Sequence, residues 1–436
     1  MHMLLPILTL VTALSVGCSG SPAPESSAPS ASVGLAPNIH QSPLSWSGTT
    51  VSFEEEVSQL DLLVTTLENR VTADPNQWLY REQAAGALLT RARLTGSWDD
   101  YARADQHLDS ALSDPAAVPW ATLASLQHSL HRFDALPETL QRLGQRFPQS
   151  DQLLADVSMR RGNLELSQGD YAAARESLDS SVLLRELPAS LGSLAVWHWR
   201  VAEFDVAESL FVQAASSYHG VAAEPRAWFH LNLGLLDLDR GRWKEALSHY
   251  RDAEKELVGS WLVEEHIAEV LLLIGEVEAA EAIYRAVIKR TNGPEFMDAL
   301  SDLLSDQGKV DEALEWSGKA RTQWDSLLLR FPAAAYGHAL GHYLDAGDAP
   351  ARALELAVAN HELRPDGEAK MLLAQAFLAL DQVKDALLVI NEALSSPHRS
   401  AELHAVAAEV FAAAGDDARA SEQSQAATAL NPFVLD

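Results

Sequence analysis

The stretch that decides the fold reads WFHLNLG at 228–234, then RGRWKEA at 240–246, then Tyr250 and Ala253. Apolar residues in both halves recur at the spacing of an amphipathic helix. Gly241 can adopt the positive φ that ends a helix, so it marks a turn between two helices. A side chain larger than Ala246 at the expected helix crossing would overpack by about 1–3 kcal/mol. The stretch therefore predicts a helix–turn–helix unit.

The same frame recurs along the chain at a nearly constant step. Its crossing alanine falls at 207, 246, 280, 313, 353, 386 and 420, with steps of 39, 34, 33, 40, 33 and 34 residues. A period of this length indicates stacked supersecondary repeats. The two longer steps predict extended helices or loops near residues 220–225 and 323–332. The N-terminal units are looser, and we expect three extra residues in the turn before Ala104.

The unit resembles the tetratricopeptide repeat, which has Leu-Gly in its first helix and Ala, an aromatic residue and Ala in its second. That resemblance implies an all-α, right-handed superhelical solenoid of about ten repeats over residues 77–436, whose first helices line a concave groove. Residues 51–76 have apolar positions at helical spacing and are expected to form a capping helix. The segments RARLTG (91–96) and SLHRF (129–133) are similar to a group of long bacterial tetratricopeptide proteins, a resemblance that implies no activity.

Composition supports a helical, strongly acidic protein. Hydrophobic residues make up 47% and aromatic residues 7%, and the formal net charge is −29. A chain of this charge repels phosphate backbones and gains little from anionic lipid surfaces, so nucleic acid is not an expected partner. The charge has two interpretations, which the sequence leaves open: a solvated surface, or acidic groups gathered where a basic partner docks.

The N-terminus has the pattern of an exported, lipid-anchored protein. Residues 4–16 are apolar, too few to span a bilayer and typical of a signal-peptide core. LSVGC at 14–18 resembles the lipobox of bacterial lipoproteins. The resemblance implies a signal peptide at 1–17, a lipidated Cys18 and a disordered linker over 18–50. The expected location is the bacterial cell envelope, with the outer membrane favoured; a cleaved secretory signal and an uncleaved anchor are the alternatives.

In the tetratricopeptide repeat, which these units resemble, defined positions of each first helix face the groove. Those positions place an acidic wall on two adjacent units and an apolar floor on a third. The wall comprises Glu265, Glu269, Glu295, Asp298, Asp302 and Asp306, and the floor comprises Trp228, Leu231 and Leu235. The wall is either a solvated face or a docking wall for a basic segment. The floor suits an amphipathic helix or extended peptide, or it packs against a neighbouring repeat.

A catalytic alternative rests on one helix. His338, His342 and Asp345 are spaced so that three possible metal ligands share a face, although the glutamate of a metalloprotease motif is missing. Phosphate-binding glycine loops and serine elbows are not found. We therefore expect no enzyme and no cofactor, but a membrane-tethered scaffold that binds a protein or peptide, basic if the carboxylates contact it. The alternatives are an assembly factor for envelope machinery of the pilus or secretin type, and a metal-dependent enzyme. The oligomeric state stays open.

Overall fold

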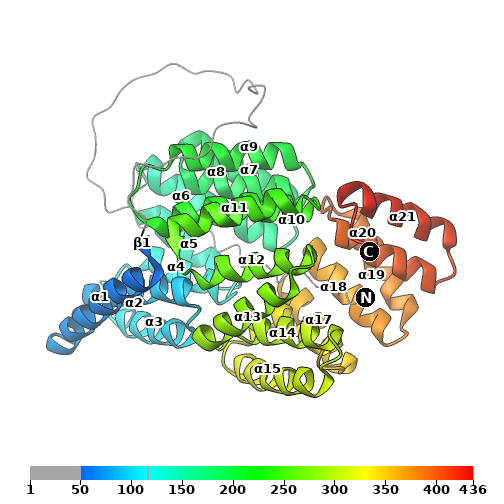
Figure 1. Ribbon diagram of the computed structural model, residues 1–436. Coiled ribbons are helices and arrows are strands. Elements are labelled where there is room, and N and C mark those ends of the chain that lie inside the picture. The colour runs from blue at the N-terminus through cyan, green and yellow to red at the C-terminus, as the bar shows by residue number, and fades with distance from the viewer. Residues whose placement is uncertain (1–50, 115–116, 147, 436) are drawn as a thin grey trace.

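The computed structural model describes residues 51–114, 117–146 and 148–435. Over these residues the chain forms twenty-one α-helices, α1–α21, and two strands of two residues, β1 and β2 (Figure 1). Helix α1, Phe53–Ala73, precedes ten consecutive hairpins. The hairpins are α2 Trp78–Thr95 with α3 Trp98–Ala111, α4 Trp120–Ser129 with α5 Leu136–Arg146, α6 Asp151–Ser167 with α7 Tyr171–Leu184, α8 Pro188–Arg200 with α9 Phe204–Ser217, α10 Ala223–Asp239 with α11 Trp243–Glu256, α12 Trp261–Leu273 with α13 Val277–Thr291, α14 Pro294–Asp306 with α15 Val310–Arg330, α16 Pro332–Leu344 with α17 Pro350–Leu363, α18 Gly367–Ala379 with α19 Val383–Ser395, and α20 Ala401–Ala413 with α21 Asp417–Leu430. The predicted all-α repeat fold is confirmed.

Each hairpin turns through one residue with positive φ. Glycine takes this position in six hairpins, and His131, Ala202, Asp348 and Asp381 take it in the other four. The amide after this residue then closes the helix end: Arg242 N–H donates to the Asp237 carbonyl at 2.8 Å. This is the bond that satisfies a terminal helix carbonyl in a left-handed cap.

The predicted crossing residues lie between the paired helices. Ala207, Ala246, Ala280, Ala353 and Ala386 are fully buried and Ala313 is nearly so, whereas Ala420 in the last hairpin is half-buried. The hairpin α2–α3 differs from the prediction. Its turn has no extra residues: Gly96 ends α2 and α3 begins at Trp98, so Tyr101 occupies the crossing position and is buried.

The two longer repeat steps have different structural causes. Near residues 323–332 the second helix is extended, since α15 has 21 residues. Near residues 220–225 a loop after α9 leads into α10, which has 17 residues. Both outcomes lie within what the spacing predicted.

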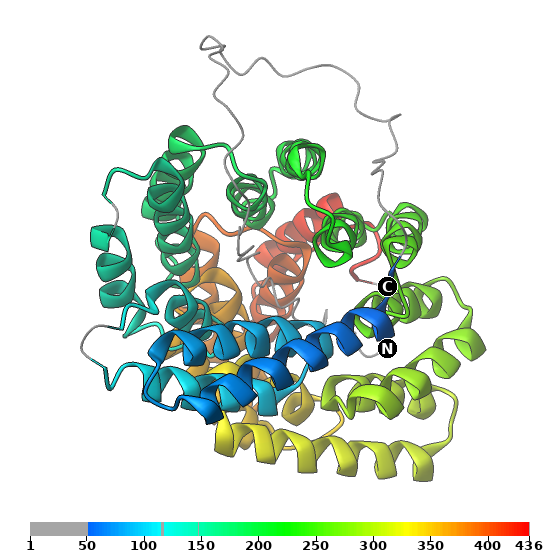
Figure 2. The same cartoon turned by 90° about the vertical axis from the view of Figure 1, so that its left-hand side faces the viewer.

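The ten hairpins coil tightly enough for helices distant in sequence to meet (Figure 2). Strand β1, Val51–Ser52, pairs in parallel with β2, Leu257–Val258. Trp261 Nε1 donates to the Leu94 carbonyl at 2.8 Å. The same closure continues along the chain through further contacts: Arg330 with Asp99, His131 with the Ala333 carbonyl, Tyr171 with the Gly367 amide, Arg200 with Glu368, and Trp243 with Phe433. Successive turns of the coil are therefore in contact.

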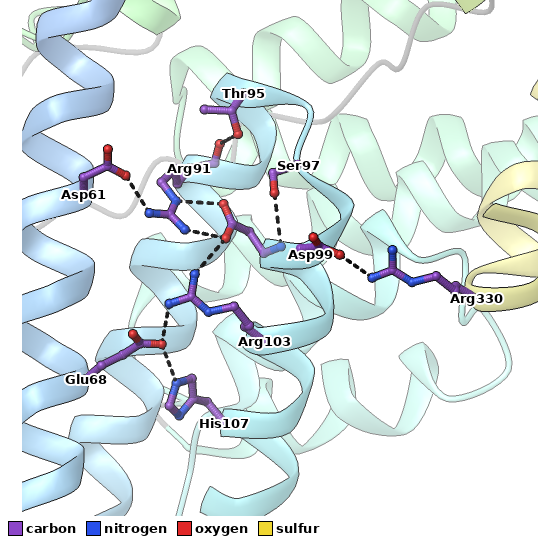
Figure 3. A network of polar contacts seen from close by, with 10 residues as sticks. Asp61, Glu68, Arg91, Thr95, Ser97, Asp99, Arg103, His107 and Arg330 are labelled. Atoms are coloured by element: carbon purple, nitrogen blue, oxygen red, sulfur yellow. Dashed lines mark hydrogen bonds and ion pairs between the residues drawn. The ribbon is translucent and has the colours of Figure 1, made fainter. Parts of the chain in front are cut away.

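Ion pairs hold the capping helix α1 onto the first hairpin (Figure 3). Arg91 of α2 contacts Asp61 of α1 at 2.6 Å and makes two hydrogen bonds, of 2.6 and 2.7 Å, to the buried Asp100 of α3. Arg103 of α3 contacts both Asp100 and Glu68 of α1. Bidentate pairing of this kind fixes geometry as well as charge. Helix α1 is thus part of the folded array.

Among the described helices, none combines the length and apolarity needed to cross a membrane. The predicted signal peptide, Cys18 and linker lie outside the described residues.

Candidate functional site

Helix α14 carries the acidic residues of the predicted wall on one face. Glu295, Asp298, Asp302 and Asp306 are spaced by three or four residues, which aligns them along a helix. The other side of α14 is apolar and buried, through Phe296, Met297, Leu300, Leu303 and Leu304. Glu295, Asp298 and Asp302 are half-buried and Asp306 is exposed. We call these four residues the acidic face of α14.

Asp298 is the structural centre of this face. Trp324 Nε1 of α15 donates to Asp298 Oδ2 at 2.8 Å, and His342 Nδ1 of α16 donates to Asp298 Oδ1 at 2.7 Å. One carboxylate therefore holds three consecutive helices together. Both of its carboxylate oxygens accept a hydrogen bond from within the chain.

The other three carboxylates of the face lack such compensation. Within the described part of the chain, Glu295, Asp302 and Asp306 form no ion pair with Lys or Arg. Burial raises the pKa of Glu295 to about 7; a backbone hydrogen bond opposes this shift, and repulsion from Asp298 adds to it. Burial, followed by repulsion from Asp345, Asp298 and Asp306, raises the pKa of Asp302 to about 7, with His342 opposing. The face thus holds closely spaced like charges at the edge of the protein interior.

The predicted wall residues on α12 lie elsewhere in the packing. Glu265 is fully buried and Glu269 is 8% exposed, with His266 between them at 1%. Burial raises the pKa of Glu265 to about 8, although His266 opposes the shift. The structure differs here from the prediction of a continuous wall. Neighbouring helices cover this part of α12, so its carboxylates belong to the core.

The predicted apolar floor is also part of the core. Leu231 and Leu235 are buried, and the Trp228 ring packs edge-on against Phe211, 6.0 Å away, and Phe229, 5.3 Å away. Helix α10 is buried on nearly all sides, polar residues such as Arg226 and Asn232 included. Leu231 and Leu235 therefore belong to the core of the array, and only Trp228, which is half-buried, retains exposed surface.

The predicted metal ligands on α16 do not converge. His342 bonds to Asp298, and the His338 ring stacks on Trp324 with centroids 6.5 Å apart. In the described ranges, two other groups bring three His, Asp or Glu ligand atoms within 4.8 Å of one another: His230, His249 and Asp252, and Glu265, His266 and Glu269. In the sequence, the second group consists of the adjacent residues Glu265 and His266, followed by Glu269 about one helical turn later. Glu265 and Glu269 also match groove positions of the repeat, so the sequence alone does not distinguish a ligand cluster from a groove wall.

These features define the class of protein: an all-α helical-hairpin repeat solenoid whose units resemble the tetratricopeptide repeat. The sequence matches no known family and no curated protein. Among solved structures, the chain is similar to yeast Tom70, with 14% identity, coverage of 85% of this chain and 87% of that chain, and a TM-score of 0.47. It is also similar to the APC/C hetero-tetramer Cut9–Hcn1, with 13% identity, coverage of 80% and 62%, and a TM-score of 0.43. A third similarity is to PilF of Pseudomonas aeruginosa, with 18% identity, coverage of 56% and 97%, and a TM-score of 0.34. The assignment of repeats to this chain rests on its ten hairpins themselves.

Proposed function

We propose that this chain is a protein-interaction scaffold in which the acidic face of α14 contacts a basic segment of a partner protein. The observation that carries the proposal is the lack of cationic partners for Glu295, Asp302 and Asp306 within the described residues. A guanidinium or ammonium group from a partner would relieve their mutual repulsion and form charge-assisted hydrogen bonds.

Other carboxylates of the chain show the contrast. Glu281 on α13 contacts Arg285 and Lys309, and those hydrogen bonds lower its pKa. Asp100 contacts Arg91 and Arg103. The pKa of Asp302 moves in the opposite direction. The acidic face of α14 therefore differs from Glu281 and Asp100, whose charge is compensated by cations of the chain itself.

Binding of an Arg-rich peptide to the purified chain tests the proposal. Neutralising two carboxylates in the variant D302N/D306N should weaken binding about tenfold, since ion pairs near the surface contribute roughly 0.2–1 kcal/mol each. The matched control E276Q/E278Q removes two exposed carboxylates near the start of α13 and should bind as the wild type does. Equal loss in both double variants would indicate attraction by net charge alone and would contradict the proposal.

The same interaction should depend on pH. Carboxyl groups with a pKa near 7 are partly neutral at pH 6 and ionised at pH 8, so Glu295 and Asp302 gain charge across this range. Peptide affinity should therefore rise from pH 6 to pH 8, and D302N/D306N should show a smaller rise. A pH-independent affinity would argue against contact with these two groups.

We further propose that a lipid on Cys18 tethers the scaffold to the bacterial envelope, on the strength of the LSVGC segment and the Ser/Pro-rich stretch after it. Two acyl chains on one cysteine would give lasting attachment, which a single chain does not. Intact-mass analysis of the mature protein should show Cys18 as a diacylated N-terminus. An unmodified Cys18 in the mature chain would overturn the tether and leave peptide binding unaffected.

A further inference from the structure

Two carboxylates and one imidazole lie together inside the array on helix α12. Glu265 is 0% exposed, His266 1% and Glu269 8%. His266 Nδ1 lies 3.3 Å from Glu265 Oε2 and 3.2 Å from Glu269 Oε2. One ligand atom from each residue lies within 4.8 Å of the ligand atoms of the other two. Three groups able to bind a cation are therefore already assembled.

This cluster has more polar atoms than the protein satisfies. Neither carboxylate oxygen of Glu265 accepts a hydrogen bond, and His266 Nε2 has no hydrogen-bond partner. Buried polar atoms in folded proteins are nearly always bonded. The ion pairs of Glu265 and Glu269 within the described chain involve His266 alone, so two carboxylates share one imidazole. Net negative charge in the interior is costly unless a bound proton or a cation compensates it.

We propose that Glu265, His266 and Glu269 form a binding site for a divalent transition-metal cation such as Zn²⁺. Bonds of about 2.0–2.2 Å to a tetrahedral Zn²⁺ place neighbouring ligand atoms about 3.3 Å apart, and the two N···O separations match that spacing. A dication with two carboxylates and a neutral imidazole has no net charge, which suits the buried position. Either Glu265 oxygen is available for a further bond, because neither accepts a hydrogen bond.

The surrounding side chains favour this ligand set. The Tyr250 ring stacks on His266, with centroids 5.5 Å apart and planes 25° apart, which fixes the imidazole orientation. Supporting contacts of this kind orient metal ligands in proteins. One imidazole nitrogen with carboxylate oxygens suits Zn²⁺ better than Ca²⁺ or Mg²⁺, which prefer all-oxygen sites. The site is separate from His338, His342 and Asp345, and it does not rest on the proposed scaffold function.

The test is Zn²⁺ binding to the full chain, measured by metal analysis after dialysis and by titration calorimetry. The expected result is one equivalent of Zn²⁺ with a raised Tm, and a Co²⁺ adduct with visible ligand-field absorption. The variants E265Q and E269Q should bind Zn²⁺ at least about tenfold more weakly. The matched control E264Q changes the neighbouring glutamate on the same helix, which contacts Arg290, and should bind as the wild type does.

Several results would overturn the proposal. One is a folded wild type that binds no stoichiometric Zn²⁺, and another is a loss of Zn²⁺ affinity in E264Q equal to that in E265Q and E269Q. A third uses the variant H249N, which changes the cluster of His230, His249 and Asp252: loss of Zn²⁺ in this variant alone would place the metal there. Circular dichroism checks folding of each variant. Should E265Q fail to fold, E269Q and the wild-type stoichiometry still decide, because Glu269 lies at the edge of the cluster.

Discussion

At the scale of single residues, the fold depends on one positive-φ residue in each hairpin turn. At two of these glycines an added Cβ would clash with a distant part of the chain. A Cβ on Gly169 would lie 2.6 Å from the Pro365 carbonyl oxygen, and one on Gly241 would lie 2.5 Å from Asn431 Oδ1. A Cβ on Gly308 would meet no atom within 4 Å, at nearly the same φ. Comparing such positions separates backbone strain from contact between turns of the coil.

We expect G169A to destabilise the protein more than G308A. Both substitutions place a side chain in the left-handed region, at a cost of about 1–2 kcal/mol. G169A adds a clash with a carbonyl oxygen of the facing turn, for about 1–3 kcal/mol more. Denaturant unfolding of the two variants measures the difference. Equal destabilisation of the two variants would mean that successive turns of the coil are not in contact at Gly169.

Residue patterns predicted some turns and missed others for a physical reason. Glycine marks a positive-φ turn because it adopts that conformation without strain, so Gly169, Gly241 and Gly308 were readable. Ala202 and Asp381 take the same position in their hairpins, but neither residue type requires a positive φ, so the sequence does not mark these turns. The alignment of Asp298 and Asp302 on one helix face followed from spacing. The burial of Glu265 did not, because it depends on which distant helices cover α12.

At the scale of elements, α15 shows how an irregular repeat serves a long-range contact. Its additional length carries Arg330 and Phe331 to the first hairpin, where Arg330 pairs with Asp99 and the Phe331 ring lies 5.2 Å from Trp98. The step of 40 residues predicted an extension but not its destination. Contacts between segments so far apart in sequence leave no periodic signal, and β1–β2 pairing was missed for the same reason.

We expect F331A to lower the free energy of unfolding by about 2 kcal/mol, because Phe331 is only half-buried and loses part of a full core contribution. The control is L329A on the same helix, where the side chain is 85% exposed and the change should stay within about 0.5 kcal/mol. Hydrogen exchange should show faster exchange in α2 and α3 for F331A. Protection unchanged in those helices would contradict a stabilising role for this contact.

At the scale of the whole molecule, histidines kept neutral between the turns make its stability sensitive to acid. Burial, followed by Arg200, lowers the pKa of His398 to about 4, with Glu368 opposing and Arg399 adding to the shift. Burial lowers the pKa of His128 to about 4 as well, with Arg160 and Arg364 contributing. A histidine with a depressed pKa binds its proton less readily in the folded state, so stability is lost as pH falls from about 6.5 towards 4.

We expect the H398Q variant to lose less stability than the wild type between pH 7 and 4.5. Over that interval the wild type should lose about 2 kcal/mol more unfolding free energy than H398Q, because each pH unit of differential protonation contributes about 1.36 kcal/mol. The change in unfolding free energy with pH is compared, and not its value at one pH, because H398Q also changes packing. H219Q alters an exposed histidine and should leave the slope unchanged. Small-angle scattering at both pH values would show whether successive turns of the coil separate. An equal loss of stability in H398Q and the wild type would exclude His398 as the origin of the acid sensitivity.

The pairing of β1 with β2 has a mechanical consequence. The first described residues do not leave the array at a free end but run beside Leu257 and Val258, near its middle. Tension transmitted through Val51 would reach α11 and α12 directly, and the hydrogen bonds between the strands would resist it in shear. A pull from the N-terminal side would thus be shared by both halves of the coil instead of peeling helices away one at a time.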